Sequence, residues 1–224
     1  MGDYLEILSS YDLLDAYLVN LRLAFFSALI ALLIGVILVL MRISPVPTMR
    51  WAGSLYVTLV RNTPLTIIIV FAALVLWPVL GLEFSRTFEV NFFWLAVVAL
   101  GVYHASFVCE ALRSGVNTVP VGQAEAARAI GLSFLPAARL VILPQAFRGA
   151  IAPLGNTLIA LIKNTTVAAA ASVSEVSQLM RAMIENQANY VLAIFFTVAI
   201  GFVVIVIPIG LLTTYLSQRL AVAR

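Results

Sequence analysis

Charge is scarce in this sequence, and so are the residues that build catalytic and metal sites. Asp, Glu, Lys and Arg make up 10% of the 224 residues, and there is one cysteine, Cys109, and one histidine, His104. A single cysteine excludes a disulfide framework or a cysteine-based metal site within the chain. The sequence also contains no Ser-His-Asp order, no H-E-x-x-H and no cysteine cluster, so it offers no candidate catalytic constellation.

Two further absences narrow the class of protein to which the sequence can belong. The sequence has no G-x-x-x-x-G-K-[ST] motif, so it lacks the loop that cradles ATP phosphates in many ATPases. Its first residues carry Asp3, Glu6, Asp12 and Asp15, where a secretory signal peptide needs a basic region. We therefore expect the first apolar run to stay in the mature protein.

Apolar residues, in contrast, are abundant. Hydrophobic side chains make up 63% of the chain, and several runs approach the roughly 20 residues needed to cross about 30 Å of hydrocarbon. Backbone polar groups in lipid must be paired within each segment, and the runs lack the alternation of barrel strands. The sequence therefore predicts an all-α polytopic membrane protein, with one transmembrane domain over residues 1–224. The five predicted transmembrane helices lie at residues 23–41, 64–80, 92–112, 151–173 and 190–216.

The positions of the arginines predict the orientation, because cytoplasmic loops are enriched in Lys and Arg. Eight arginines follow the first, third and fifth predicted spans, and three lie on the other side. The eight are Arg42, Arg50, Arg113, Arg128, Arg139, Arg148, Arg219 and Arg224, and the three are Arg22, Arg86 and Arg181. We expect the N-terminus outside, the C-terminus in the cytoplasm, and the long connection 113–150 in the cytoplasm.

This cytoplasmic connection has the pattern of two short helices with a break between them. Good helix formers fill "VGQAEAARAI" at residues 121–130, and Gly131 follows where a left-handed residue ends many helices. Ser133 is placed to cap a second helix with Pro136 in its first turn, and Pro144 is expected to end or kink it. Short helices of this kind need a partner, or the cytoplasmic ends of the spans, to be stable.

The same connection contains E-A-A, three residues, G, nine residues and then V-I-L-P. This spacing resembles the EAA loop in membrane subunits of ABC importers, whose pattern ends in I-x-L-P, so Val141 is the one departure. The matching residues assigned to ATPase coupling are Glu125, Ala126, Ala127, Gly131, Leu143 and Pro144. The stretches "RNTPL", "EALRSGVNTV" and "PLGNTLIALIKNTT" extend the resemblance to permeases for polar amino acids. Within that group, the sequence is most similar to permeases of actinobacterial glutamate importers.

The resemblance implies a type I importer permease in the bacterial plasma membrane. In that family the loop forms a coupling helix that docks into a groove on a cytoplasmic ATPase. The implied partners are two ATPase subunits, which hold the ATP and magnesium, a second permease subunit that is a relative or another copy, and an extracytoplasmic amino-acid-binding protein. The chain itself is expected to bind no cofactor and no nucleic acid, and to move an amino acid by alternating access rather than to catalyse a reaction.

A polar residue at membrane depth points to the substrate path. Lys163 lies 12 residues into the fourth predicted span, about 18 Å from the cytoplasmic boundary at about 1.5 Å per residue. Charge at that depth is expected to face the bundle interior or a wet cavity. Asn164 and Thr165 follow as side chains that can cap a helix start.

A similar order precedes the second span, where Arg61 is followed by Asn62, by Thr63 as expected N-cap and by Pro64 in the first helical position. Helix N-termini attract anions, and discontinuous membrane helices direct such ends at substrate carboxylates. We therefore interpret Lys163, Asn164, Arg61 and Asn62 as substrate-path residues.

Structural explanations remain open for these positions. Arg61 can reach lipid headgroups or fix the adjacent loop, and Lys163 can pair with Glu110 or with an acid of a partner subunit. Glu110 can also anchor the cytoplasmic connection, and His104 can be a hydrogen-bonded histidine within the bundle. Each arginine of the connection can serve only to set the topology, and the connection itself can be a solvated loop.

Two other functional classes are also open. An ion-coupled secondary transporter would show repeated span pairs and several buried acids, whereas Glu110 is the one acid within the predicted spans. A non-transporting assembly subunit would use the Ala-rich connection for docking alone. Copurification with an ATPase, and uptake that depends on it, would separate the three classes.

Overall fold

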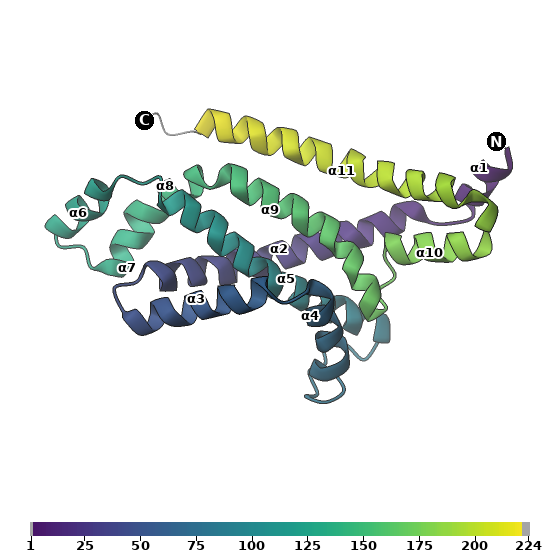
Figure 1. Cartoon of the computed structure of the whole chain (residues 1–224), viewed down its shortest axis with the longest axis horizontal. Helices are drawn as coiled ribbons and strands as arrows, with labels where there is room; N and C mark the ends of the chain where they lie inside the picture. Colours follow the sequence, from purple (N-terminus) through teal and green to yellow (C-terminus); the bar gives the residue numbers. More distant parts are fainter. Residues whose placement is uncertain (1, 221–224) are drawn as a thin grey trace. The chain divides into compact units, whose positions relative to one another are not determined.

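The computed structural model describes residues 2–220, and all regular structure in that range is helical (Figure 1). The long helices are α2 (Leu13–Ile43), α5 (Phe88–Val116) and α11 (Val191–Leu220), and the shorter ones are α1 (Gly2–Ser9), α3 (Pro47–Arg61), α4 (Leu65–Phe71), α6 (Val121–Ala129), α7 (Phe134–Ala137), α8 (Leu143–Gly149), α9 (Ile151–Asn164) and α10 (Val176–Asn186). Wide π turns form η1 (Ala72–Leu76) and η2 (Ala138–Ile142), and tight 3-10 turns form η3 (Thr165–Ala171) and η4 (Ala188–Tyr190). Arg224, counted above with the cytoplasmic arginines, lies outside the described residues.

The chain divides into two compact units. Unit 1 comprises the residues up to Ala28, Pro64–Gly101 and Ala160–Pro208, and unit 2 comprises Leu29–Thr63, Val102–Ile159 and the residues from Ile209 onward. Helices α2, α5, α9 and α11 contribute residues to both units.

Three helical segments in the described range are long and apolar enough to cross a membrane: α2, α5 and the run Ala188–Leu220. They contain the first, third and fifth predicted spans. The second and fourth predicted spans fall on broken helix pairs, α3 with α4–η1 and α9–η3 with α10. The chain therefore has five candidate spans if each broken pair crosses once.

The break after η3 is closed by its own hydrogen bonds. Ser172 has a left-handed backbone with φ 58°, the N–H of Ser172 donates to the Ala169 carbonyl, and the N–H of Val173 donates to the Ala168 carbonyl. This is the Schellman arrangement, in which one left-handed residue pairs the last carbonyls of a helix. A serine there bears the steric cost that a glycine avoids.

Helix α10 then begins with a buried acidic cap. The side chain of Glu175 is fully buried, and it accepts hydrogen bonds from the backbone N–H groups of Ser177 and Gln178 and from the Ser177 hydroxyl. A carboxylate at a helix N-terminus pairs orphan N–H groups and interacts favourably with the helix dipole. Both ends of the break are therefore satisfied within the chain.

Asn20 of α2 joins this break to the rest of unit 1. Its Nδ2 donates to Thr165 Oγ1 at 2.8 Å and to Glu175 Oε2 at 2.9 Å, and its Oδ1 accepts from the Val176 N–H at 3.1 Å. The Asn20 side chain is 1% exposed. One buried amide thus links α2, η3 and α10, beside an apolar cluster around Ala16 and Val198.

Unit 2 has its own core, where the second half of α2 packs against α3, against the second half of α5 and against the start of α9. Buried Val39, Val57 and Leu112 belong to it. At Gly35 the helices approach closely, because an added Cβ would lie 2.8 Å from the Val108 Cβ. This core supports the connection between α5 and α9 described below.

We predict that Asn20→Ala destabilises the protein by about 3 kcal/mol, because it leaves the Val176 N–H unpaired and takes a donor from a buried carboxylate. The free energy of unfolding in detergent micelles measures this effect. Asn117→Ala is the control, since Asn117 is exposed and its loss should change stability by less than about 0.5 kcal/mol. Equal stability of the two variants would contradict the assigned role of Asn20.

Candidate functional site

The connection between α5 and α9 folds as two helical arms, which we call the elbow (residues 121–149). The first arm is α6 and the second is α7, η2 and α8, and α6 contacts both α7 and η2. The prediction of helix, break and helix is thus confirmed. The first arm begins at Val121, directly after Pro120, whose extended backbone (φ −57°, ψ 135°) precedes the helix.

Gly131 makes the bend of the elbow. Its φ is +86°, its N–H donates to the Arg128 carbonyl, and the Leu132 N–H donates to the Ala127 carbonyl. This is again a Schellman ending, and the left-handed conformation explains why glycine is favoured at this position. No atom lies within 4 Å of the place where a Cβ would stand, so the requirement for glycine comes from the backbone and not from crowding.

The second arm corrects part of the prediction. Ser133 is at the N-cap with an extended backbone, but its hydroxyl makes no capping hydrogen bond. Pro144 does not end the helix, which continues to Gly149. Proline has no N–H for the carbonyl four residues earlier, and the wide turn η2 just before Pro144 accommodates this loss.

Small residues fix the elbow to the end of α5. A Cβ on Gly115 would lie 2.9 Å from the carbonyl carbon of Ala146, and a Cβ on Gly149 would collide with the Thr118 hydroxyl. Phe147 packs on the core of unit 2. A movement of α8 is therefore passed directly to the end of a long helix, because packed helices with no space between them move together.

The six residues predicted to contact an ATPase differ in exposure. Glu125, Ala126, Gly131 and Pro144 are exposed, Leu143 is half-buried and Ala127 is buried. Ala127 and Leu143 therefore help to pack the elbow, while the other four are available to a partner.

The elbow exposes four large apolar side chains. Val121, Ile130, Leu135 and Leu140 are each at least 60% exposed. A groove of about 520 Å³ continues this surface to the turn between α2 and α3. Its lining includes Ile37, Leu40, Met41, Val46, Met49, Phe134 and Leu135. Exposed apolar patches mark contact with protein, membrane or ligand, so this surface is a candidate contact site.

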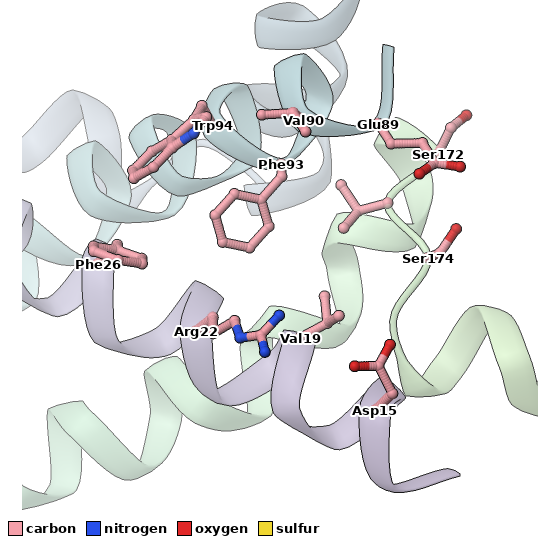
Figure 2. Close-up of a pocket in the computed structure, with 11 residues that line it drawn as sticks. Asp15, Val19, Arg22, Phe26, Glu89, Val90, Phe93, Trp94, Ser172 and Ser174 are labelled. Atoms are coloured by element: carbon pink, nitrogen blue, oxygen red, sulfur yellow. The ribbon is translucent and has the colours of Figure 1, made fainter. Parts of the chain in front are cut away.

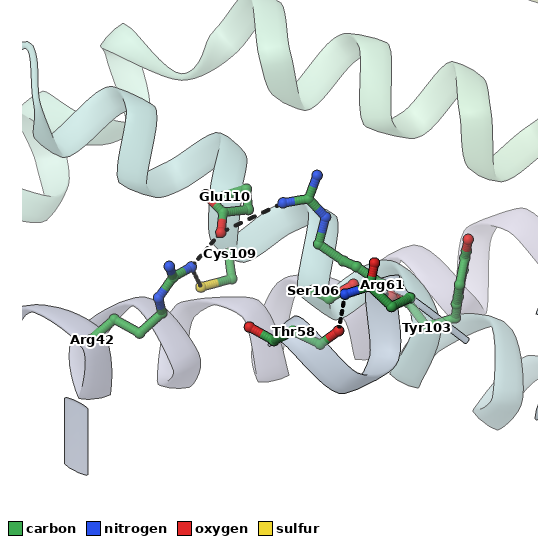
Figure 3. A network of polar contacts seen from close by, with 8 residues as sticks. Arg42, Thr58, Arg61, Tyr103, Ser106, Cys109 and Glu110 are labelled. Atoms are coloured by element: carbon green, nitrogen blue, oxygen red, sulfur yellow. Dashed lines mark hydrogen bonds and ion pairs between the residues drawn. The ribbon is translucent and has the colours of Figure 1, made fainter. Parts of the chain in front are cut away.

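Beside the elbow, unit 2 holds an ion-pair cluster centred on Glu110 (Figure 3). Glu110 Oε1 lies 2.5 Å from Arg42 Nη1 and 3.6 Å from Arg61 Nη1. Arg42 also donates to the sulfur of buried Cys109, and the Arg61 guanidinium lies 5.4 Å from the Phe107 ring centroid. Glu110 thereby ties the C-terminal ends of α2 and α3 to α5, so Arg61 has a structural partner.

The N-cap role predicted for Thr63 is wrong. Asn62 Nδ2 donates to the Thr58 carbonyl at 2.7 Å, and Thr63 Oγ1 donates to the Leu59 carbonyl at 2.9 Å. Both side chains close the C-terminus of α3, whose last carbonyls lack partners in the helix. Pro64 itself is the N-cap of α4, with no side-chain cap.

The prediction of a helix start beside Lys163 is also wrong. Thr165 Oγ1 donates back to the Ile162 carbonyl at 2.6 Å, and the helix tightens into η3 instead of restarting. Lys163 is exposed and Asn164 is half-buried. Both lie in unit 1, whereas Arg61 and Asn62 lie in unit 2, and Glu110, the partner considered for Lys163, is paired with two arginines.

Sequence reasoning missed Glu175 and Asn20. The predicted fourth span ended at residue 173, which put Glu175 outside the membrane and hid its cap. A Glu just before the amphipathic stretch 176–186 was the available signal, although Ser, Thr, Asp and Asn are the usual caps.

Comparison with known proteins identifies the family of this chain. Residues 30–222 match the family described as binding-protein-dependent transport system inner membrane component. The chain belongs to this family. It is 49% identical over 218 residues to a glutamate transport system permease protein of Corynebacterium glutamicum, covering 95% of this chain and 96% of that protein. It is 46% identical to a protein of the same description from Corynebacterium efficiens, with the same coverage.

Solved structures show the same fold. An amino acid ABC transporter crystallised with histidines matches with a TM-score of 0.78 at 24% identity, over 98% of this chain and 96% of that one. A methionine ABC transporter in an inward-facing conformation matches with a TM-score of 0.74 at 22% identity, over 94% and 96%. The inner membrane component described here thus has the all-α fold of an ABC importer permease, and it is a transport subunit rather than an enzyme.

We predict that the two ion pairs of Glu110 differ in strength in double-mutant cycles. The Arg42 side chain is 10% exposed and that of Arg61 is 44% exposed. Combining Glu110→Gln with Arg42→Gln should give a coupling energy of about 1–3 kcal/mol, and with Arg61→Gln less than about 1 kcal/mol. Unfolding of the permease in detergent gives these values, and equal couplings would refute the ranking.

Proposed function

We propose that this chain is the membrane-spanning permease subunit of an ATP-driven amino acid importer, and that glutamate is its substrate. The observation that carries the proposal is the elbow, an apolar bent surface in a chain that matches the transport family over residues 30–222. The choice of glutamate is supported by the two corynebacterial relatives, which are described as glutamate permeases.

The elbow is the proposed contact for an ATPase. Glu125 and the exposed side chains of Val121 and Ile130 offer one acidic group within an apolar surface. Apolar anchors of this type dominate the energy of protein contacts. Two ATPase subunits hold the ATP and magnesium, and their closure moves the elbow, α8 and the end of α5 together.

The remaining partners and the orientation belong to the same proposal. The permease pairs with a related permease or with a second copy of itself, and an extracytoplasmic binding protein delivers the amino acid. The N-terminus lies outside and the C-terminus in the cytoplasm of the bacterial plasma membrane, as the arginine distribution predicts.

The proposed substrate path is centred on Lys163 and Asn164. Lys163 is exposed in the described chain, in a segment where a free charge is costly unless it meets water or a ligand. No helix N-terminus is open to a substrate here, because the helix continues into η3 at Thr165 and the start of α10 is capped by the Glu175 carboxylate. Any attraction for a substrate carboxylate at this place therefore comes from the lysine itself.

We predict that Gly131→Ala uncouples ATP hydrolysis from uptake. Alanine in the left-handed conformation costs about 1–2 kcal/mol, which opens the end of α6. ATP-dependent uptake of glutamate into proteoliposomes should fall at least about fivefold while the ATPase subunits still hydrolyse ATP.

Gly122→Ala is the matched control for this variant. Gly122 lies in the same arm and is equally uncrowded, but it has no positive φ. Gly131→Asn should retain more uptake than Gly131→Ala, because asparagine tolerates the left-handed region. Full coupling in Gly131→Ala would contradict the lever role of the bend.

We predict that Lys163→Ala abolishes uptake while the complex with the ATPase still copurifies. A positive charge lost from the path removes the partner of the substrate carboxylate, and Lys163→Arg should keep part of the activity. Arg181→Ala removes an exposed charge from α10 and serves as the control. Unchanged uptake in Lys163→Ala would remove Lys163 from the path.

A further inference from the structure

Unit 1 contains a pocket of about 440 Å³ that none of the predicted substrate-path residues lines. Its walls come from the N-terminal parts of α2 and α5 and from the linker between η3 and α10 (Figure 2). Its lining includes Asp15, Arg22, Glu89, Phe93, Trp94 and Ser174. This volume falls within the range of about 300–1,000 Å³ typical of small-ligand sites.

The pocket brings together charges of both signs that do not pair with each other. Arg22 and Asp15 come from α2, and Glu89 comes from the first turn of α5. Within the described residues, ion pairs closer than 4.0 Å are found only at Glu110. Figure 2 shows the Arg22 guanidinium in the space below the Phe93 ring, while both carboxylates lie toward Ser174. The cation and the anions are thus held at separate places around one cavity.

Aromatic side chains form a rigid apolar wall on the other side. The ring centroids of Phe26 and Trp94 are 5.0 Å apart, and those of Phe93 and Trp94 are 5.4 Å apart with nearly perpendicular rings. Edge-to-face packing of this kind holds rings in place. An apolar wall with a few fixed polar groups is the usual composition of a ligand site.

The third wall is the break in the helix pair α9–η3 and α10. Ser172 and Ser174 line the cavity, and Ser172 has a left-handed backbone, the one non-glycine residue with positive φ in the described chain. Interrupted membrane helices place polar groups at substrate sites in many transporters. The hydrogen bonds of buried Asn20 to the Glu175 carboxylate and the Val176 N–H fix the end of this linker.

We propose that this pocket binds a small zwitterion, with its anionic group at Arg22 and its ammonium group at Asp15 and Glu89. Two sources have this chemistry, a free α-amino acid and the ethanolamine headgroup of a phospholipid. The first source rests on the proposed function and makes the pocket an additional subsite for the transported amino acid. In the proposed orientation the pocket lies toward the outer side, since it is built at the N-terminal ends of α2 and α5.

Trp94 provides a reporter inside the pocket. The purified complex with its ATPase, without the binding protein, is placed in nanodiscs of phosphatidylglycerol, and the emission of a Trp94→Phe complex is subtracted to isolate Trp94. L-Glutamate and L-glutamine should change this emission saturably. Glutarate lacks the ammonium group and n-butylamine lacks an anionic group, so neither should do so at the same concentrations.

Charge variants test the two ends of the site. Arg22→Gln and Asp15→Asn should each weaken the Trp94 response about tenfold or more, because each removes a charge-assisted contact. Arg86→Gln and Glu83→Gln are the controls, since both residues are exposed in the loop before α5 and line no part of the pocket. Equilibrium dialysis with radiolabelled glutamate on the same variants gives a second measurement, and size-exclusion chromatography verifies that each variant is folded.

A separate experiment tests the lipid headgroup as the ligand. Phosphatidylethanolamine nanodiscs should change the Trp94 emission in the same Arg22-dependent way if the headgroup is the ligand, and added amino acids should then have little effect. A response to neither class, or one that Arg22→Gln leaves intact, overturns the proposal. ATP-dependent uptake by the unmodified complex is measured in parallel, so that loss of the pocket assignment is distinguished from failure of the importer function.

Discussion

A helix that breaks inside an apolar medium must pair the backbone groups that the break exposes, and the rest of this structure depends on how that is done. Between η3 and α10 the carbonyls are paired by a left-handed Ser172 and the N–H groups by the buried Glu175 carboxylate. Asn20 then fixes the break to α2. Without these bonds an interrupted span would expose several polar groups, each costing several kcal/mol in lipid.

A helix end closed by one left-handed residue occurs at two places in the described chain and has a different consequence at each. At Gly131 it turns the elbow at a surface, where a glycine adopts the left-handed conformation at no steric cost. At Ser172 it interrupts a candidate span beside a pocket, and the strained serine adds a hydroxyl to the lining. The elbow packs against the end of α5, whereas the break between η3 and α10 lines a cavity.

Sequence reasoning reached the features that depend on local pattern. The apolar runs predicted the long helices, and the spacing of Gly131 and Ser133 predicted the bend of the elbow. It failed where side chains had a choice of partner: Thr63 and Thr165 donate backward to carbonyls instead of capping a new helix. The pairs of Glu110 and of Asn20 join residues far apart in the chain, so no local rule identifies them.

The burial of Cys109 has a practical consequence. It is the sole thiol of the chain and lies beneath Arg42, so reagents that need an exposed thiolate react with it slowly. Cysteines introduced at exposed positions, such as Ile130 or Leu140, would then carry spin or fluorescent labels with the native residue left in place. Labels at two such positions can then report changes within the elbow on an otherwise unaltered protein.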